Sequence, residues 1–241
     1  MTLIIGILCN DGAVLGADGA ATFGPGMGET TIRQPVRNKL RIISSDAAAG
    51  MSGSVGMSQR FSAMIDSLRQ QELVQQTPTG PRQVRLHQLR PEDAMGFLRQ
   101  QLWQGLLQPE LGIAQTMAQH VGNQAPVQAA LTSSIACLPI GAELCLFQFD
   151  PQGMPDRATA DLPFVAVGRG QRIADPFLAF LRRIYWPDRL PSLEEGVLAT
   201  VWALTHAIET NAGGVGDPIQ IIKVSREGNG WLAAEIEEAS W

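Results

Sequence analysis

Thr2 has the residue type and the position that a self-sufficient nucleophile requires. It follows Met1 directly, and a small residue at this position usually allows removal of the preceding methionine. Removal would leave one residue with both a hydroxyl group and a free α-amine. An α-amine titrates near about pH 8, so it can accept the hydroxyl proton at cellular pH without a histidine. The sequence therefore predicts nucleophilic hydrolysis by the chain's own first residue.

Three further residues supply what this chemistry needs. Lys39 is a lysine in an apolar, strand-like context, where its ammonium would favour the deprotonated amine and hydroxyl of Thr2. Asp18 would hold that ammonium, because a buried cation needs a partner. Gly53 stands at a turn ahead of a helical pattern, where a backbone N–H can stabilise an oxyanion. Together with Thr2 they form an amine-based variant of a catalytic triad.

Two short apolar runs must position Thr2 and Asp18. Residues 3–9 and 13–17 are β-rich, and the Asn-Asp-Gly sequence at 10–12 between them is a strong hairpin signal. Both runs are apolar at consecutive positions, which indicates strands buried on both faces.

A second strand pair and a helix must position Lys39 and Gly53. We expect strands at 39–43 and 47–51, followed by a helix from Ser54 whose apolar residues recur at helical spacing. The remaining elements follow from similar patterns. They are a loop at 24–28, a polar stretch without regular structure at 77–90, a helix from Pro91, strands at 130–138, 144–149 and 164–168, helices at 173–184 and 192–208, and a closing hairpin of 219–224 with 231–236.

The opening MTLIIGILCNDGAVLGADGAAT resembles that of proteasome β-subunits and of the bacterial peptidase HslV. The segment NKLRII at 38–43 is similar to the strand that carries the catalytic lysine in those proteins. The segment MSGS at 51–54 is similar to the turn that supplies their oxyanion N–H. With these motifs, the chain is most like a bacterial proteasome homologue.

The resemblance implies an α+β fold, a four-layer αββα sandwich of two antiparallel sheets between helical layers, in a single domain over residues 1–241. It implies a threonine-type endopeptidase in which Thr2, Asp18, Lys39 and Gly53 are catalytic. It also implies stacked homo-oligomeric rings of six or seven subunits that enclose the sites, a peptide or unfolded protein substrate and, by analogy, an ATPase unfoldase partner. The substrate would add as a strand at Ala20 and Thr22, and Met51 would form the floor of an apolar specificity pocket.

Three positions depart from the pattern of that family in the shell around the nucleophile. The family has a serine between two glycines where this chain has Arg169, and it has an aspartate and a second serine where this chain has Glu209 and Ala212. Poor positioning at such places can lower a rate by orders of magnitude. Two alternatives therefore stay open: a ring-forming structural homologue with impaired catalysis, and an amidase of the same fold that acts on a small molecule.

Composition limits the other possibilities. A formal net charge of −5 and a pI near 5.2 argue against nucleic acid or an anionic membrane as the main partner. We expect a cytoplasmic protein, because the apolar start is too short for a signal peptide and no apolar stretch is long enough to span a membrane. Cys9, Cys137 and Cys145 have no metal-binding spacing and predict buried free thiols. We expect no metal and no cofactor.

Overall fold

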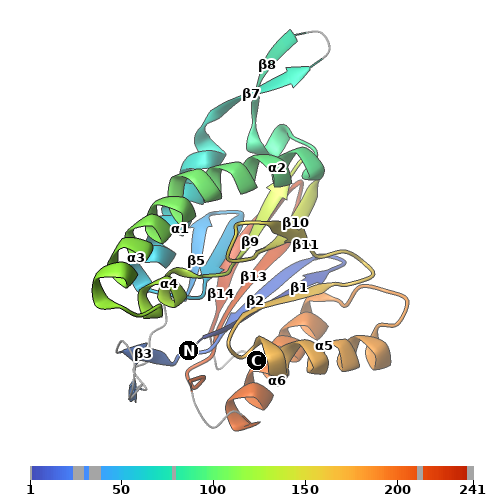
Figure 1. Ribbon diagram of the computed structural model, residues 1–241. Coiled ribbons are helices and arrows are strands. Elements are labelled where there is room, and N and C mark those ends of the chain that lie inside the picture. The colour runs from blue at the N-terminus through green and yellow to red at the C-terminus, as the bar shows by residue number, and fades with distance from the viewer. Residues whose placement is uncertain (1, 24–29, 33–38, 78–79, 211–213, 238–241) are drawn as a thin grey trace.

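Two five-stranded antiparallel sheets form the centre of the protein (Figure 1). The computed structural model describes residues 2–23, 30–32, 39–77, 80–210 and 214–237. The first sheet has the order β12-β1-β2-β13-β14 and the second β11-β10-β9-β6-β5. The strands of the first sheet are β1 (Leu3–Cys9), β2 (Gly12–Ala17), β12 (Phe164–Gly168), β13 (Gln220–Glu227) and β14 (Gly230–Ile236). Those of the second are β5 (Leu40–Ser44), β6 (Ala47–Met51), β9 (Ser134–Ile140), β10 (Glu143–Phe149) and β11 (Pro155–Arg157).

The two sheets share a hydrophobic core. Ile4, Leu15 and Ile222 from the first sheet pack with Leu40 and Leu146 from the second. All five are almost completely buried. The consecutive apolar residues of β1 and β2 therefore have the double burial that their sequence predicts, because their other face packs against helices.

Helices cover the outer faces of both sheets. Against the second sheet lie α1 (Val55–Gln70) and α2 (Pro91–Leu102), and against the first lie α5 (Gln171–Tyr185) and α6 (Leu193–Thr210). In α1, the predicted stripe is confirmed, since Met57, Phe61, Ile65 and Leu68 are all buried. The Ser54 side chain caps this helix by accepting a hydrogen bond from the backbone N–H of Met57.

A capping box begins α6, as the sequence indicates. The backbone N–H of Ser192 donates to the Glu195 carboxylate at 2.8 Å, and the backbone N–H of Glu195 donates to the Ser192 hydroxyl at 3.3 Å. Arg189 also pairs with Glu195, and its hydrogen bonds are the main reason why the pKa of Glu195 falls to about 2. The Leu193 N–H also donates to the Asp11 carboxylate at 2.9 Å, which joins the start of α6 to the turn between β1 and β2.

Replacing Ser192 with alanine is expected to lower the free energy of unfolding by about 1 kcal/mol, because the first turn of α6 loses its cap. Chemical denaturation would measure the change. Ser192→Thr keeps a hydroxyl acceptor and serves as the control, so an equal loss in both variants would contradict this role.

Two stretches differ from their predicted structure. Two antiparallel strands, β7 (Glu72–Thr77) and β8 (Gly80–Arg85), form a projecting ribbon where the sequence predicts the end of a helix and then polar, irregular chain (Figure 1). A 3-10 turn (Leu86–Gln88) follows it. The helix predicted from Pro91, whose end the sequence leaves open, continues past Pro109 through a π turn (Trp103–Leu107) into α3 (Gln108–Val121), with the short α4 (Ala125–Ala130) after it. Pro109 is tolerated because it lies in the first turn of α3, where its missing N–H is not needed.

The expected four-layer sandwich is therefore corrected to a mixed α/β fold. A second ribbon, β3 (Ala21–Phe23) with β4 (Thr30–Ile32), and the β7–β8 ribbon both lie outside the two five-stranded sheets. The extended α2–π–α3 stretch likewise does not fit a simple helical layer. The predicted loop at 24–28 lies outside the described residues.

Two further observations concern the expected class of protein. The three cysteines are buried and free, as predicted. Within the described residues, none of the helices has the length and apolar character needed to span a membrane.

Candidate active site

The Asp18 carboxylate is the centre of the candidate site. It is completely buried and accepts four hydrogen bonds. Its Oδ1 accepts from the Leu3 backbone N–H at 2.8 Å and from the Lys39 ammonium at 2.6 Å. Its Oδ2 accepts from the backbone N–H groups of Ala20 at 3.1 Å and Gly216 at 3.2 Å. All four partners donate, which suits an ionised carboxylate, since such a group only accepts.

Lys39 reaches this carboxylate from the start of β5. Its side chain is only 11% exposed, so the ammonium is largely removed from water. Burial lowers the pKa of Lys39 below its ordinary value, and the charge and hydrogen bond of Asp18 partly oppose this. The pairing of Asp18 with Lys39 that the sequence predicts is present in the structure. A less basic lysine beside a buried carboxylate is an arrangement that can tune a neighbouring amine.

The hairpin of β1 and β2 explains why Asp18 lies beside the start of the chain. Ile4 pairs with Ala17 in the antiparallel ladder, and the Asp18 N–H donates to the Leu3 carbonyl at 3.1 Å just beyond that pair. The Asp18 side chain then returns to the Leu3 N–H. Thr2 directly precedes Leu3. Its backbone is therefore only one residue away from the N–H that binds the Asp18 carboxylate.

Gly168, the last residue of β12, and Gly170 lie against the carbonyl of Thr2. The Gly170 N–H lies 3.4 Å from this oxygen, and a Cβ on Gly168 would be only 2.1 Å from it. Gly168 also has a φ of +95°, which favours glycine. Arg169 lies between these glycines, and its side chain is exposed. Arg169, which replaces the serine of the proteasome pattern, thus lies in a segment whose backbone contacts Thr2.

Gly168→Ala is expected to displace Thr2 and to lower the free energy of unfolding by about 1–3 kcal/mol, since the new methyl group meets the Thr2 carbonyl in a strained backbone conformation. Chemical denaturation would measure the loss. Gly122→Ala is the matched control, because Gly122 has a φ of +72° but nothing within 4 Å of an added Cβ. Equal losses in both variants would show that backbone strain alone is responsible.

Gly53 forms the turn between β6 and α1. It has a φ of +138°, and a Cβ there would be 2.4 Å from the Thr132 methyl group. Ser52 fixes the turn by pairing with Ser133 through both its backbone and its hydroxyl group. Among the described residues, no acceptor takes the Gly53 N–H. Hydrogen bonds between Ser52 and Ser133 thus hold the turn in place, and the Gly53 N–H is available as a donor.

The strand before this turn lies beside β1 across the core. Gly50 faces the first sheet so closely that a Cβ there would be 3.1 Å from the Ile4 side chain. Ile4 is two residues from Thr2, and Gly50 is three residues from Gly53. The structure therefore pairs Asp18 with Lys39, places Thr2 one residue before the Leu3 N–H that Asp18 binds, and places Gly53 two residues after β6, the neighbour of β5.

The predicted substrate-binding residues have mixed surroundings. The Ala20 N–H is already bonded to Asp18, so it cannot pair with an added strand. The backbone of Thr22 pairs with Thr31 of β4 on one edge. Met51 is 3% exposed and packs in the core cluster beneath α1 and α2.

The outer residues of the predicted site are less closely connected. Glu209 is exposed in the last turn of α6, and Ala212 lies outside the described residues. The structure also adds contacts that sequence reasoning missed, namely the Gly216 N–H on Asp18 and the Gln220 side chain on the residue after Lys39. Thr132 was missed too, and its buried hydroxyl has no hydrogen-bond partner within the described part of the chain.

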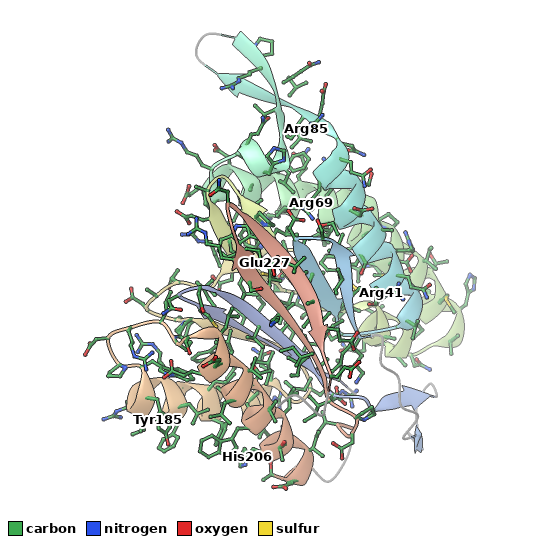
Figure 2. All side chains as sticks on the ribbon, turned by 180° about the vertical axis from the view of Figure 1, so that it is seen from behind. Arg41, Arg69, Arg85, Tyr185, His206 and Glu227 are labelled. Carbon is green, nitrogen blue, oxygen red and sulfur yellow. The ribbon has the colours of Figure 1, made fainter. Side chains whose placement is uncertain are left out.

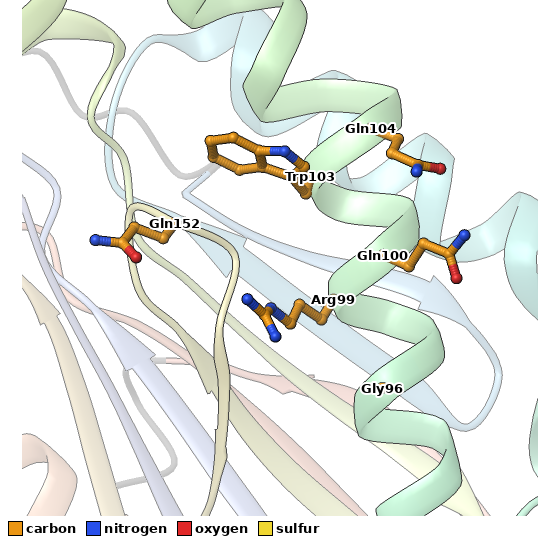
Figure 3. A pocket seen from close by; sticks show the side chains of 6 residues that line it. All are labelled: Gly96, Arg99, Gln100, Trp103, Gln104 and Gln152. Carbon is orange, nitrogen blue, oxygen red and sulfur yellow. The ribbon is translucent and has the colours of Figure 1, made fainter.

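One hollow of about 400 Å³ lies away from these residues. It lies between the helix that carries Arg99 and Trp103 and the turn that carries Gln152, and all three residues line it (Figure 3). None of the predicted site residues lines it. Within the described ranges, no cluster of three histidine, cysteine or acidic side chains could hold a metal ion.

No family model matches the sequence, and no curated relative matches it either. The fold, however, is similar to that of solved Anbu structures. Anbu (ancestral beta-subunit) from Yersinia bercovieri aligns with a TM-score of 0.56 and 14% identity over 99% of this chain and 88% of that chain. Anbu from Hyphomicrobium sp. strain MC1 aligns with a TM-score of 0.60 and 18% identity over 98% and 88%. A mutant of the same Hyphomicrobium protein gives 0.60 and 18% over 99% and 88%.

These structures correct the resemblance to proteasome β-subunits and HslV. The motifs that carry it, at Thr2, Asp18, Lys39 and Gly53, are few and short, so they do not distinguish one family from another. The three-dimensional arrangement of the whole chain is a more specific criterion. By that criterion, the chain has the fold of the Anbu proteins.

Proposed function

We propose that the protein is a threonine-type endopeptidase that hydrolyses peptide bonds through Thr2 after removal of Met1. The observation that carries the proposal is that one buried carboxylate oxygen of Asp18 binds both the Lys39 ammonium and the N–H of the residue after Thr2. This contact fixes a cation with a lowered pKa beside the start of the chain, where an amine and a hydroxyl group would be available.

In the proposed reaction, the Thr2 hydroxyl oxygen attacks the carbonyl carbon of the peptide, and its proton passes to the Thr2 α-amine. The oxyanion that forms accepts a hydrogen bond from the Gly53 N–H. The C–N bond then breaks, and the departing amine takes the proton from the Thr2 ammonium. Water, deprotonated by the same amine, hydrolyses the ester and restores the Thr2 hydroxyl.

Lys39 and Asp18 have supporting roles in this mechanism. The ammonium of Lys39 favours the neutral amine and stabilises negative charge that develops on the Thr2 oxygen. Asp18 holds Lys39 and, through the N–H of Leu3, also the start of β1. Gly168 and Gly170 restrict the Thr2 carbonyl, so that the nucleophile has little freedom to leave this position.

Self-association is the second part of the proposal. Large apolar side chains are exposed on both helices: Phe180, Ile184 and Tyr185 on α5, where Figure 2 labels Tyr185, and Leu198 and Trp202 on α6. Exposed apolar side chains on neighbouring helices are typical of protein interfaces. We expect homo-oligomeric rings that would enclose the sites and restrict access to peptides and unfolded chains.

The exposure of Glu209 favours an alternative, a structural homologue with impaired catalysis. The carboxylate at this position lies in the last turn of α6 instead of in the buried network around Asp18. A third possibility, amide hydrolysis on a small molecule, would use the same nucleophile.

Incubation of the processed protein with small fluorogenic peptides and with a covalent threonine-directed inhibitor tests the proposal. We expect peptide turnover that stops when the inhibitor forms an adduct, with the adduct mapped to Thr2 by mass spectrometry. An adduct on Thr2 without peptide turnover would favour the impaired homologue. Turnover of small amides alone by a monomeric protein would favour the amidase.

A further inference from the structure

A buried glutamine side chain joins the two sheets next to Lys39. Gln220 is the first residue of β13 and is 6% exposed. Its carbonyl oxygen accepts the Leu40 N–H at 3.1 Å, and its amide nitrogen donates to the Leu40 carbonyl at 3.2 Å. Leu40 directly follows Lys39 and begins β5 of the other sheet. One side chain thus binds both backbone groups of the lysine's neighbour.

The backbone of Gln220 completes a closed set of contacts. It pairs with Ala17 of β2, the residue before Asp18. Asp18 in turn binds the Lys39 ammonium. From these contacts we infer that Gln220 is a positioning residue that fixes Lys39 against Asp18. It sets the distance between the strand that carries the carboxylate and the strand that carries the ammonium.

The chemistry of the side chain explains why glutamine suits this place. β5 is an edge strand of its sheet, so the outward N–H and C=O of Leu40 have no neighbouring strand. A carboxamide has one acceptor and a donor group, as a peptide does, and can take the place of that strand. An ionised carboxylate would accept the N–H but would repel the carbonyl oxygen. An apolar side chain would leave both groups without a partner.

The surroundings indicate what loss of this amide would do. A hollow of about 630 Å³ borders Leu40 and Gln220, and the charged residues Arg41, Asp66 and Glu235 also line it. Water from this hollow could hydrate the freed Leu40 groups, so the fold should survive. The start of β5 would then be less firmly held, and Lys39 would become better hydrated. Because burial is the main cause of its lowered pKa, that pKa should rise toward the ordinary value.

The lysine content of the chain makes this change directly measurable. Lys39 and Lys223 are the only lysines in the sequence. Protein labelled with ¹³C at the lysine Cε therefore gives two NMR signals, which Lys223→Arg assigns. We expect the Lys39 signal to titrate at a higher pH in Gln220→Met than in the wild type. If the proposed function holds, kcat for peptide hydrolysis should also fall about 10-fold, because Lys39 is less well placed.

Gln220→Glu provides the second, near-isosteric test. A neutral carboxyl group has a donor and an acceptor and can keep both bonds to Leu40, whereas the ionised form cannot. Burial and the nearby Asp66 and Glu235 should raise the pKa of the introduced carboxyl, and Arg41 should oppose them. We expect the ratio of variant to wild-type kcat to be near one at low pH and to fall as pH rises. If Gln220→Met does not fold, the pH dependence of kcat in Gln220→Glu tests the inference in its place.

The control is Val224→Ala, which removes two buried methyl groups from the same strand, four residues away. It should leave the Lys39 titration unchanged. An unchanged Lys39 titration in both Gln220 variants would overturn the inference. An equal shift in Val224→Ala would do the same, because it would show general loosening of the sheet.

The kinetic part rests on the proposed function, but the NMR titration needs no substrate. If the wild type does not hydrolyse peptides, the proposed function is contradicted, and the NMR titration of Lys39 alone decides this inference.

Discussion

Thr2→Ala is expected to lower kcat for peptide hydrolysis by about 10⁴-fold or more, which is the scale of loss when an enzyme of this kind loses its nucleophile. The substitution removes the attacking hydroxyl group and keeps the α-amine, Lys39 and Asp18. The fold should change little, because the one hydrogen bond of Thr2 within the described part of the chain is accepted by its carbonyl oxygen, which the substitution keeps. Hydrolysis of fluorogenic peptides is the measurement, after mass spectrometry has established that both proteins begin at residue 2.

Thr2→Ser is the matched control for this experiment. Serine keeps a hydroxyl group and an α-amine in the same places, so we expect much of the activity to remain. Undiminished hydrolysis in the alanine variant would rule out the proposed mechanism. Equal loss in both variants would instead indicate that the threonine methyl group is required for the position of the nucleophile.

Asp18→Asn is expected to lower the free energy of unfolding by about 3–5 kcal/mol, which is typical when a buried ion pair loses one partner. The carboxylate accepts from four donors, two on each oxygen. An asparagine has only one carbonyl oxygen, so its NH₂ group must face two of these donors. Chemical denaturation measures the loss of stability. Activity should fall at least about 100-fold, since Lys39 and the start of β1 are no longer held together.

Asp156→Asn is the control for charge removal, because this aspartate is exposed on β11. A surface substitution of this kind should stay within about 0.5 kcal/mol of the wild type. If Asp18→Asn had an equally small effect, the buried network around Asp18 would not have the structural role that its contacts indicate.

Strong local patterns allowed much of the fold to be predicted from sequence. Strand β12 has the predicted bounds, and the hairpin of β1 and β2 differs from its prediction by one residue. Ser192 caps α6 as its sequence pattern indicates, because capping depends on residues only three positions apart. The pairing of Asp18 with Lys39 was also predictable, since a lysine in an apolar strand requires a buried anion.

What the sequence did not predict depends on long-range contacts or on weak local patterns. Gly216 meets Asp18 from 198 residues away in the chain, and Gln220 meets Leu40 from 180 residues away. Neither residue has a local signal for its role. The β7–β8 ribbon was missed because few of its residues are buried, Val84 among them, so its strands do not alternate clearly. The continuation beyond Pro109 requires a π turn, which helical periodicity does not reveal.

The most direct test of the central claim is the mass of the N-terminal peptide in protein that hydrolyses peptides. The account predicts that active chains begin at Thr2 with a free α-amine, because a preceding residue would acylate the proposed base. It also predicts that chains with Met1 still attached are inactive. Full hydrolytic activity in a preparation in which every chain retains Met1 would contradict the account.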